Sequence, residues 1–348
     1  MDLKPLSDHK RETHLTGQSL IVLHMNQNPV SIVIPNYNGA AILEVNLPKV
    51  IKACHGYDGK CEIIVVDDAS SDHSVEMLRH SFSQVKLIRH NENQGFADTV
   101  HTGISAASHE IIILLNSDVW PHTDFISPLV KTLLNCSNVF AVTPLVYDPE
   151  GRPQNFSWNR YTFVRGTFKS TAWKLEDALL RREREGPLKS LYASGGSMAV
   201  RKDRFLNLGG FLPIYKPFYS EDMDLCTRAW MHGWQTLFEP RSKVVHDHIG
   251  TIKRFFQSKK IRITRIRNRN YYTWLYSSWR RLILSHIPWS ILRLFLRLLR
   301  LDVTFPVALF KSLVNIRSVI SLRSQIKRAQ PFKTLDQLII EIESSCTK

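Results

Sequence analysis

The chain has 348 residues and a formal net charge of +15, and 43% of its residues are hydrophobic. This length allows about two domains, at roughly 100–200 residues per domain. The content of 15 Gly and 16 Pro excludes collagen-like and low-complexity chains, and the hydrophobic content excludes a wholly disordered one.

The positive charge is concentrated near the carboxyl terminus. Residues 1–250 contain 26 basic and 27 acidic side chains, whereas residues 251–348 contain 20 basic and four acidic ones. The net charges of the two parts are therefore −1 and +16. This asymmetry predicts a neutral globular unit followed by a segment that contacts an anionic surface.

The five cysteines are scattered and lack CxxC spacing. We therefore expect neither a disulfide framework nor a structural zinc site, and we favour a reducing compartment. The first 28 residues lack the continuous apolar core of a secretory signal, and the sequence contains no uninterrupted apolar run of about 18 residues. We expect a cytosolic chain that lies on a membrane without crossing it.

Strands and helices alternate along the first half of the chain. The predicted strands are Ser31–Pro35, Cys61–Val66, Val85–Arg89 and Ile111–Leu115. Helical spacing predicts helices over Ala40–Lys52, from about His73, and over Phe96–Ala107. This alternation is typical of right-handed βαβ units, so we assign the chain to the α/β class with a mostly parallel sheet and flanking helices.

Polar residues follow each of these strands. The four groups are Pro35-Asn36-Tyr37-Asn38, Asp67-Asp68, His90-Asn91 and Asn116-Ser117-Asp118. The carboxyl ends of parallel strands lie on one edge of the sheet, where ligands bind. Any one of these residues could be a turn former, but the set together predicts a ligand crevice.

The sequence contains neither GxGxxG after the first strand nor GxxxxGK[ST], which are the usual phosphate-binding loops. A nucleoside diphosphate bound here needs a cation, and Mn²⁺ or Mg²⁺ prefers oxygen ligands. Asp118 follows a very apolar strand and suits that role.

Five sequence blocks, in this order, resemble the GT-A-fold glycosyltransferases of family 2, particularly the bacterial non-processive, rhamnosyltransferase-like branch. The blocks are Ser31–Gly39, Ile64–Asp72, Asn93–Ala97, Leu114–Val119, and Gly195–Arg201 continuing to Ser220–Arg228. The resemblance covers about residues 30–250. It implies a Rossmann-like GT-A fold, with a nucleotide-binding half at 29–125 and an acceptor half at 126–250.

The resemblance also assigns roles to individual residues. The implied nucleotide-sugar-binding positions are Pro35, Tyr37, Asn38, Asp67, Asp68, Asn93, Gly95, Asn116, Gly195 and Gly196. Asn116-Ser117-Asp118 stands where the family has its DxD metal motif, so Asp118 is the implied metal ligand. His246, five residues before Thr251, is the implied second ligand, although His246 and His248 could instead be an ordinary strand pair.

Glu221-Asp222-Met223-Asp224 matches the segment that supplies the catalytic base, with Asp222 as the best candidate and Glu221 beside it. Acidic residues at this point could equally mark a helix N-terminus. The role of Arg228 stays open. The QxxRW motif of processive synthases is absent, so the resemblance implies inverting transfer of one sugar to a glycan or lipid-linked glycan precursor, with Mn²⁺ or Mg²⁺ as cofactor.

The carboxyl-terminal segment, residues 251–348, alternates apolar and basic residues. His286, Ser290, Arg293, Arg297 and Arg300 share one helix face by their spacing. We expect an amphipathic helix at the inner face of the plasma membrane, with its arginines reaching the lipid headgroups. We expect these aromatic residues at the same depth: Tyr271, Tyr272, Trp274, Tyr276, Trp279 and Trp289.

Three alternatives remain. Residues Leu292 to Leu299 could pack on the preceding domain rather than on lipid. The basic segment could bind nucleic acid, although no RRM, KH, zinc-finger or helix-turn-helix signature supports this. The protein could also bind a nucleotide-sugar without catalysis, since Asn116-Ser117-Asp118 has a single carboxylate. Residues 1–28 carry no signal that we can interpret.

Overall fold

The computed structural model describes residues 28–247, 257–329 and 333–344. Four parallel strands form one side of its main sheet: β1 (Val30–Asn36), β2 (Cys61–Asp67), β3 (Lys86–Arg89) and β4 (Ile111–Leu115). Their order is β3-β2-β1-β4, and Asn36 at the end of β1 is in register with Asp67 at the end of β2. The strands predicted from apolar runs are confirmed, and their carboxyl ends share one edge as expected.

The sheet continues with strands from the second half of the chain. These are β10 (Ser197–Arg201), β6 (Val139–Tyr147), β11 (Gln235–His246) and β5 (Val119–Pro121), and the two-residue β9 (Leu188–Lys189) also pairs with β11. β10 runs antiparallel to both β4 and β6, whereas β6 and β11 are parallel to each other. β11 also pairs with β5, which places His246 opposite Val119.

Helices cover both faces of this sheet because both faces are apolar. On one face lie α1 (Ala40–His55), α2 (Ser74–Ser81) and α4 (Ile126–Asn135). On the other lie α3 (Phe96–Ala106), α6 (Lys202–Asn207) and α7 (Glu221–Met231). The short 3₁₀ helix η1 (Pro213–Tyr215) precedes α7, and α5 (Ala178–Glu185) precedes β9.

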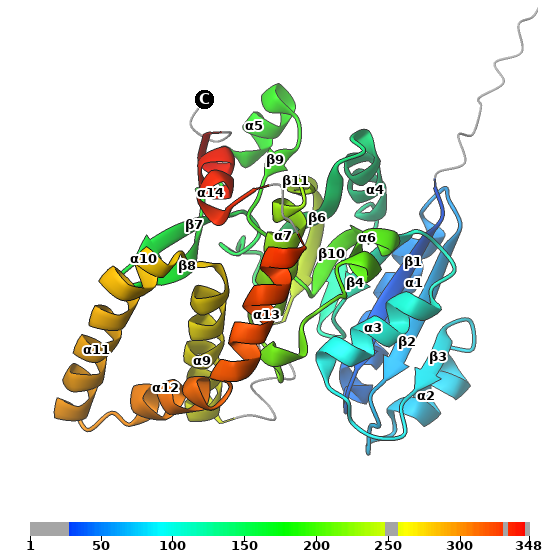
Figure 1. The fold of residues 1–348 in the computed structure, drawn as a ribbon. Coiled ribbons are helices and arrows are strands. Elements are labelled where there is room, and N and C mark those ends of the chain that lie inside the picture. Colours follow the sequence, from blue (N-terminus) through cyan, green and yellow to red (C-terminus); the bar gives the residue numbers. More distant parts are fainter. Residues whose placement is uncertain (1–27, 248–256, 330–332, 345–348) are drawn as a thin grey trace, which may run out of the picture.

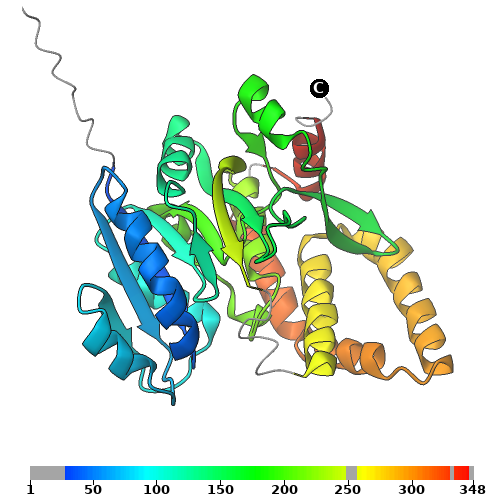
Figure 2. The ribbon, with the colours of Figure 1, turned by 180° about the vertical axis from the view of Figure 1, so that it is seen from behind.

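A separate hairpin, β7 (Asn159–Val164) and β8 (Thr167–Ala172), connects the sheet to the carboxyl-terminal helices. Those helices are α9 (Ser258–Tyr276), α10 (Trp279–Arg281), η2 (Leu282–His286), α11 (Ile287–Leu299), α12 (Thr304–Val314), α13 (Ile316–Arg328) and α14 (Leu335–Ser344). Figures 1 and 2 show α9 and α11 on the same side of the molecule, and the chain runs along them in opposite directions. α12 lies across their lower ends in Figure 1. α13 then returns toward the sheet.

The expected aromatic cluster divides into two groups. Tyr271, Tyr272 and Tyr276 on α9 are buried in a core shared with Trp230 of α7 and Leu338 of α14. Trp274 is half-buried on the same helix and donates to His286, whereas Trp279 and Trp289 are exposed. The expectation that all six lie at a membrane is therefore wrong for the α9 tyrosines, which attach α9 to the sheet-bearing part of the protein.

The arginines of α11 bond to the protein itself, whereas the sequence led us to expect them at lipid headgroups. His286 and Ser290 are buried, and Arg293 donates to the carbonyl of Arg165 at the tip of the β7–β8 hairpin. Arg297 is paired with Asp302 at 2.7 Å. The polar stripe thus faces the protein, while the remaining face is exposed; its members include Ile283, Leu284, Ile287, Ile291, Leu292, Phe295, Leu298 and Leu299.

The continuous helical run Trp279–Leu299 is long and apolar enough to cross a membrane. α12 and α13 are long and apolar enough only when taken together, and they are bent by 61° at their junction. The expectation that the chain lies on a membrane without crossing it therefore stays a prediction. It was based on uninterrupted apolar runs, and His286, Arg293 and Arg297 interrupt this one.

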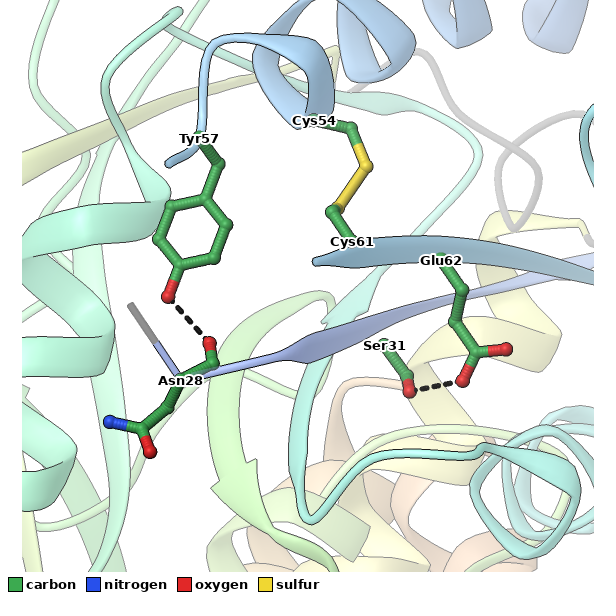
Figure 3. The surroundings of a disulfide bond; sticks show 6 residues. All are labelled: Asn28, Ser31, Cys54, Tyr57, Cys61 and Glu62. Atoms are coloured by element: carbon green, nitrogen blue, oxygen red, sulfur yellow. Dashed lines mark hydrogen bonds between the residues drawn. A yellow bond between two sulfur atoms is a disulfide. The ribbon is translucent and has the colours of Figure 1, made fainter. Parts of the chain in front are cut away.

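Cys54 and Cys61 form a disulfide (Figure 3), so the cysteines no longer support the reducing compartment that we favoured from the sequence. Cys54 lies in the last turn of α1 and Cys61 begins β2. The chain reverses direction between them, which brings their Cα atoms to 5.7 Å, within bridging range. Cys136 and Cys226 are free thiols, and Cys346 lies outside the described residues.

Candidate active site

The ends of β1 and β2 are joined by their own side chains. Asn36 Nδ2 donates to Asp67 Oδ1 at 2.9 Å, and the backbone N–H of Ser70 donates to Asp67 Oδ2 at 3.0 Å. Asp67 is fully buried. Its carboxylate therefore fixes the shape of the loop after β2, and direct contact with a ligand stays a prediction.

Asp68 holds the next loop in the same way. Its carboxylate accepts hydrogen bonds from the backbone N–H groups of Gln94 and Gly95 at 2.9 and 2.8 Å and lies 2.8 Å from His90 Nδ1. Asn93 Nδ2 is 3.4 Å from the Asp68 carbonyl oxygen. The predicted residues Asp68, Asn93 and Gly95 are therefore brought together.

Tyr37 and Asn38 follow β1 at the same edge. Asn38 accepts from the backbone N–H of Ser71 at 2.8 Å, which ties the two loops together, and Pro35 lies in β1 opposite Val66. Tyr37 is 37% exposed at this edge, and its contact with a ligand stays a prediction.

Asp118 and His246 come together although 128 positions separate them in the sequence. Asp118 Oδ1 lies 3.5 Å from His246 Nε2, and the Asp118 carbonyl accepts from the backbone N–H of Asp247 at 3.0 Å. The pairing of β5 with β11 produces this approach. His248 and Thr251, which belong to the same predicted block, lie outside the described residues.

The Asp118 carboxylate has the features of a cation ligand. Its Oδ1 is buried and has no hydrogen-bond donor within the described part of the chain. Among the residues described, no group of three or more His, Cys, Asp or Glu side chains could hold a metal ion. From the described residues, a cation here would have Asp118 and His246 as ligands, with further oxygens from a bound phosphate or from water.

Gly195 and Gly196 bring the two halves of the site into contact. A Cβ atom on Gly196 would lie 2.8 Å from Asn116 Nδ2, and one on Gly195 would lie 3.4 Å from the Asp222 Cβ. The backbone N–H of Asn116 also donates to the Gly196 carbonyl at 2.9 Å. The Asn116 amide and the start of α7 thus pack on the same backbone, and a side chain at Gly196 would displace the Asn116 amide.

Glu221 and Asp222 begin α7. Asp222 Oδ2 accepts from the backbone N–H of Gly195 at 3.2 Å, and its Oδ1 accepts from that of Met223 at 2.8 Å. Burial and the neighbouring Asp222 charge raise the pKa of Glu221 to about 8. Burial also raises the pKa of Asp222. At neutral pH this arrangement favours a protonated Glu221.

Sequence reasoning did not identify the role of Asp224 and Arg228. Asp224 is fully buried, forms an ion pair with Arg228 at 2.8 Å, and accepts from the hydroxyls of Tyr215 and Tyr276 at 3.0 and 2.7 Å. Arg228 also donates to the Gly210 carbonyl at 2.7 Å. These two residues hold α7 in place, which answers the question left open for Arg228.

Asn268 of α9 was also missed. Its Nδ2 lies 2.8, 2.9 and 2.8 Å from the carbonyl oxygens of Tyr215, Phe218 and Tyr219, and the side chain is fully buried. These carbonyls belong to the segment that leads into Glu221 and Asp222. The only available sequence signal was an uncharged residue within a run of arginines.

A cavity of about 620 Å³ opens beside these groups. Its lining residues are Asp148, Arg152, Pro153, Gln154, Asn155, Phe156, Asn159, Ser170 and Ala172. The Phe156 ring contacts His246 edge-on at 6.2 Å between centroids. On the other side Ser170 is hydrogen bonded to Tyr192, whose pKa is raised by burial and by the Asp222 charge. Through Phe156, one wall of the cavity thus adjoins His246.

The sequence model of glycosyl transferase family 2 matches residues 31–208. The chain belongs to glycosyl transferase family 2. The predicted family is confirmed, whereas the rhamnosyltransferase-like branch stays a prediction.

Two curated relatives are similar over part of this chain. It is 27% identical over 202 residues to the inactive polypeptide N-acetylgalactosaminyltransferase-like protein 5 of Macaca fascicularis, covering 53% of this chain and 44% of that protein. It is 35% identical over 109 residues to the undecaprenyl-phosphate 4-deoxy-4-formamido-L-arabinose transferase of Proteus mirabilis, covering 30% and 33%. The chain therefore spans less than half the length of either relative.

A solved structure resembles nearly the whole chain. The mannosyltransferase PcManGT from Pyrobaculum calidifontis, in complex with GDP-Man and Mn²⁺, gives a TM-score of 0.52 at 19% identity and covers 93% of this chain and 88% of that one. This likeness shows the fold alone, and it confirms the predicted GT-A class together with the carboxyl-terminal helices.

Replacing Glu221 by Gln should change how stability depends on pH. The pKa of Glu221 is about 8 in the folded protein against an ordinary value of 4.5, so folding takes up a proton between these values. The contribution of Glu221 protonation to the free energy of unfolding is fully present below pH 4.5 and is lost as the pH rises through about 8. Denaturant unfolding across this range should show a smaller loss for Glu221→Gln than for the wild type. The exposed Glu92→Gln is the control, and an unchanged pH profile for Glu221→Gln would contradict the assignment.

Replacing Asn268 by Ala should loosen the segment that leads into α7. The loss of a buried hydrogen-bonding group leaves carbonyls unsatisfied, so backbone amides of residues 216–222 should exchange roughly ten-fold faster or more in deuterium-exchange mass spectrometry. Asn270→Ala is the matched control, because Asn270 is also buried on α9 but bonds Ser312 at 3.1 Å. Equal acceleration in both variants would mean that Asn268 contributes only to general stability.

Proposed function

We propose that the protein is a metal-dependent, inverting glycosyltransferase that moves one sugar from a nucleotide-sugar donor to a hydroxyl of a glycan or a lipid-linked glycan precursor. The observation that carries this proposal is the arrangement around Gly195 and Gly196. Their backbone contacts both Asn116, in the turn that ends at Asp118, and Asp222. A leaving-group site and a candidate base therefore lie on either side of one short segment.

Asp118 and His246 would hold Mn²⁺ or Mg²⁺, and the donor diphosphate would complete the ligand set. The unsatisfied Asp118 Oδ1 supports this role, and PcManGT was solved with Mn²⁺ and GDP-Man. When bound, the cation stabilises negative charge on the departing nucleoside diphosphate. With two protein ligands, its affinity should be weak before the donor arrives.

Asp222 would act as the general base. A sugar hydroxyl is a poor nucleophile, and a carboxylate within hydrogen-bonding reach can accept its proton as the glycosidic bond breaks. The raised pKa of Asp222 makes it a stronger base, and protonation of Glu221 removes a competing negative charge. A single displacement on the face opposite the leaving diphosphate inverts the anomeric centre.

The 620 Å³ cavity is the proposed acceptor site. Its polar lining, with Phe156 beside His246, offers hydrogen bonds and one aromatic surface, as small-molecule sites commonly do. Because the chain lacks the motif of processive synthases, we propose addition of a single sugar rather than polymerisation.

We further propose that transfer takes place at the cytoplasmic face of the plasma membrane. The exposed apolar face of α11 supports a peripheral association, and the Proteus mirabilis relative is named for a lipid phosphate, undecaprenyl phosphate. Nucleic-acid binding has less support, because Arg267, Arg293 and Arg323 all donate to backbone carbonyls of the protein itself.

Two substitutions test the proposal. The donor is first identified by thermal-shift screening of dTDP-, UDP- and GDP-linked sugars with Mn²⁺, since bound donor raises stability. Asp222→Asn should keep the donor-induced shift and lower transfer by roughly 10²–10⁴-fold. Asp118→Ala should lose both the Mn²⁺-dependent shift and transfer.

Asp124→Asn is the control, because Asp124 is an exposed carboxylate near β5 and lies outside the site. Normal transfer by Asp222→Asn would show that another group is the base. A wild-type protein that binds a donor but transfers nothing with any tested acceptor would favour the inactive, donor-binding alternative, for which the Macaca fascicularis relative is a precedent.

A further inference from the structure

The exposed apolar face of α11 continues onto α12. At the far end of α11, Leu299 is 66% exposed, and on α12 Phe310 and Val314 are 68% and 65% exposed. Monomeric soluble proteins rarely expose a contiguous apolar surface of this kind without a partner. The exposed apolar side chains between positions 279 and 314 are together called the apolar face.

A basic cavity lies where α9 meets α12. It has a volume of about 280 Å³ and is lined by Pro217, Gln257, Lys259, Lys260, Ile263, Thr264, Arg267 and Lys311. All of these residues lie in the described part of the chain, and none of them is acidic. Four cationic side chains thus surround one small cavity, which fits a phosphate group.

The basic cavity and the apolar face are at the same end of the molecule. Lys311 lines the cavity, and its neighbour Phe310 belongs to the apolar face. Asp302, in the turn between α11 and α12, is paired with Arg262 of α9 at 3.0 Å and with Arg297 of α11 at 2.7 Å. These ion pairs fix the three helices relative to one another at the lower edge of Figure 1.

We propose that the apolar face inserts into an anionic membrane leaflet and that the basic cavity binds the phosphate group of a lipid in that leaflet. A lipid supplies acyl chains for the apolar face and a phosphate for the cavity. The alternative occupant is a second copy of the chain. Each copy would contribute a surface from a segment with a net charge of +16, and the repulsion between these charges opposes association. The lipid is therefore the occupant that matches both features.

The cavity is also connected to the active site. Pro217 forms part of its wall, five residues before Asp222. Arg267, which lines the cavity, donates to the carbonyl of Lys216, and the adjacent Asn268 holds the same segment. Lipid binding would thus place the start of α7 close to the membrane surface. The importance of this placement for catalysis rests on the proposed function, whereas lipid binding itself does not.

Vesicle co-sedimentation of the full chain, without donor or acceptor, tests the proposal. The probes are vesicles of phosphatidylcholine alone, of phosphatidylcholine with phosphatidylglycerol, and of phosphatidylcholine with a polyprenyl phosphate. The wild type should bind both anionic vesicles far more strongly than the neutral ones. Lys259→Glu/Lys311→Glu should weaken that binding by roughly thirty-fold or more, because each basic residue near an anionic leaflet contributes to binding.

Control variants separate a defined site from diffuse charge. Lys327→Glu/Arg328→Glu makes the same charge change at exposed positions of α13 and should retain most binding. Ile291→Glu/Phe295→Glu, on the apolar face, should lose binding to all vesicles. Val45→Glu/Leu180→Glu is its control, because it makes the same change at exposed apolar positions of α1 and α5, and it should retain binding. Retained folding of each variant is checked by its thermal unfolding.

Three results would overturn the inference. The first is a wild type that does not bind anionic vesicles. The second is an equal loss of binding in Lys259→Glu/Lys311→Glu and Lys327→Glu/Arg328→Glu, which would mean diffuse charge. The third is thermal stabilisation of the protein by free inorganic phosphate as large as that by vesicles with the same phosphate concentration, which would mean a site for soluble anions. Because no sugar transfer is measured, each of these results leaves the proposed sugar transfer standing, whereas a failure to bind anionic vesicles would also remove the proposed location at the membrane.

Discussion

The close packing of the Gly195–Gly196 backbone is the constraint on which the rest of the site depends. β10 is the antiparallel strand between β4 and β6, so the residues that precede it emerge at the edge where the parallel strands end. Asn116 packs on one side of this backbone, and Asp222 accepts a hydrogen bond from it on the other. A Cβ at Gly196 would displace the Asn116 side chain, and one at Gly195 would come within 3.4 Å of Asp222 Cβ.

The carboxyl-terminal helices are part of this architecture as well as a candidate membrane surface. Asn268 and Tyr276 of α9 bond to the backbone before α7 and to Asp224 within it. The buried Asp224–Arg228 pair depends on those partners, since a buried charge without them is costly. α9, whose neighbours α11 and α12 form the proposed lipid-binding surface, therefore also supports the candidate base.

The sequence predicted the elements and the edge but not the contacts between distant segments. Apolar runs located β1 to β4, and strand ends located Asp67, Asp68 and Asp118, because these signals are local. The partners of Asp224 and Arg228 lie far away in the sequence and left no local pattern. The pairing of Cys54 with Cys61 depends on how sharply the chain turns between α1 and β2, which composition does not reveal. Spacing showed that Arg293 and Arg297 share a helix face, but periodicity alone does not say whether that face points inward or outward.

The central claim is that Asp118 and His246 together bind a divalent cation only when a nucleoside diphosphate supplies the remaining ligands. The most direct measurement is a titration of Mn²⁺ followed by the electron paramagnetic resonance signal of the free ion, with and without UDP or GDP. We expect tight Mn²⁺ binding with a diphosphate, weak binding without it, and loss of the difference in Asp118→Ala and His246→Ala. Mn²⁺ bound equally well without nucleotide, or bound unchanged in the Asp118→Ala variant, would contradict the account.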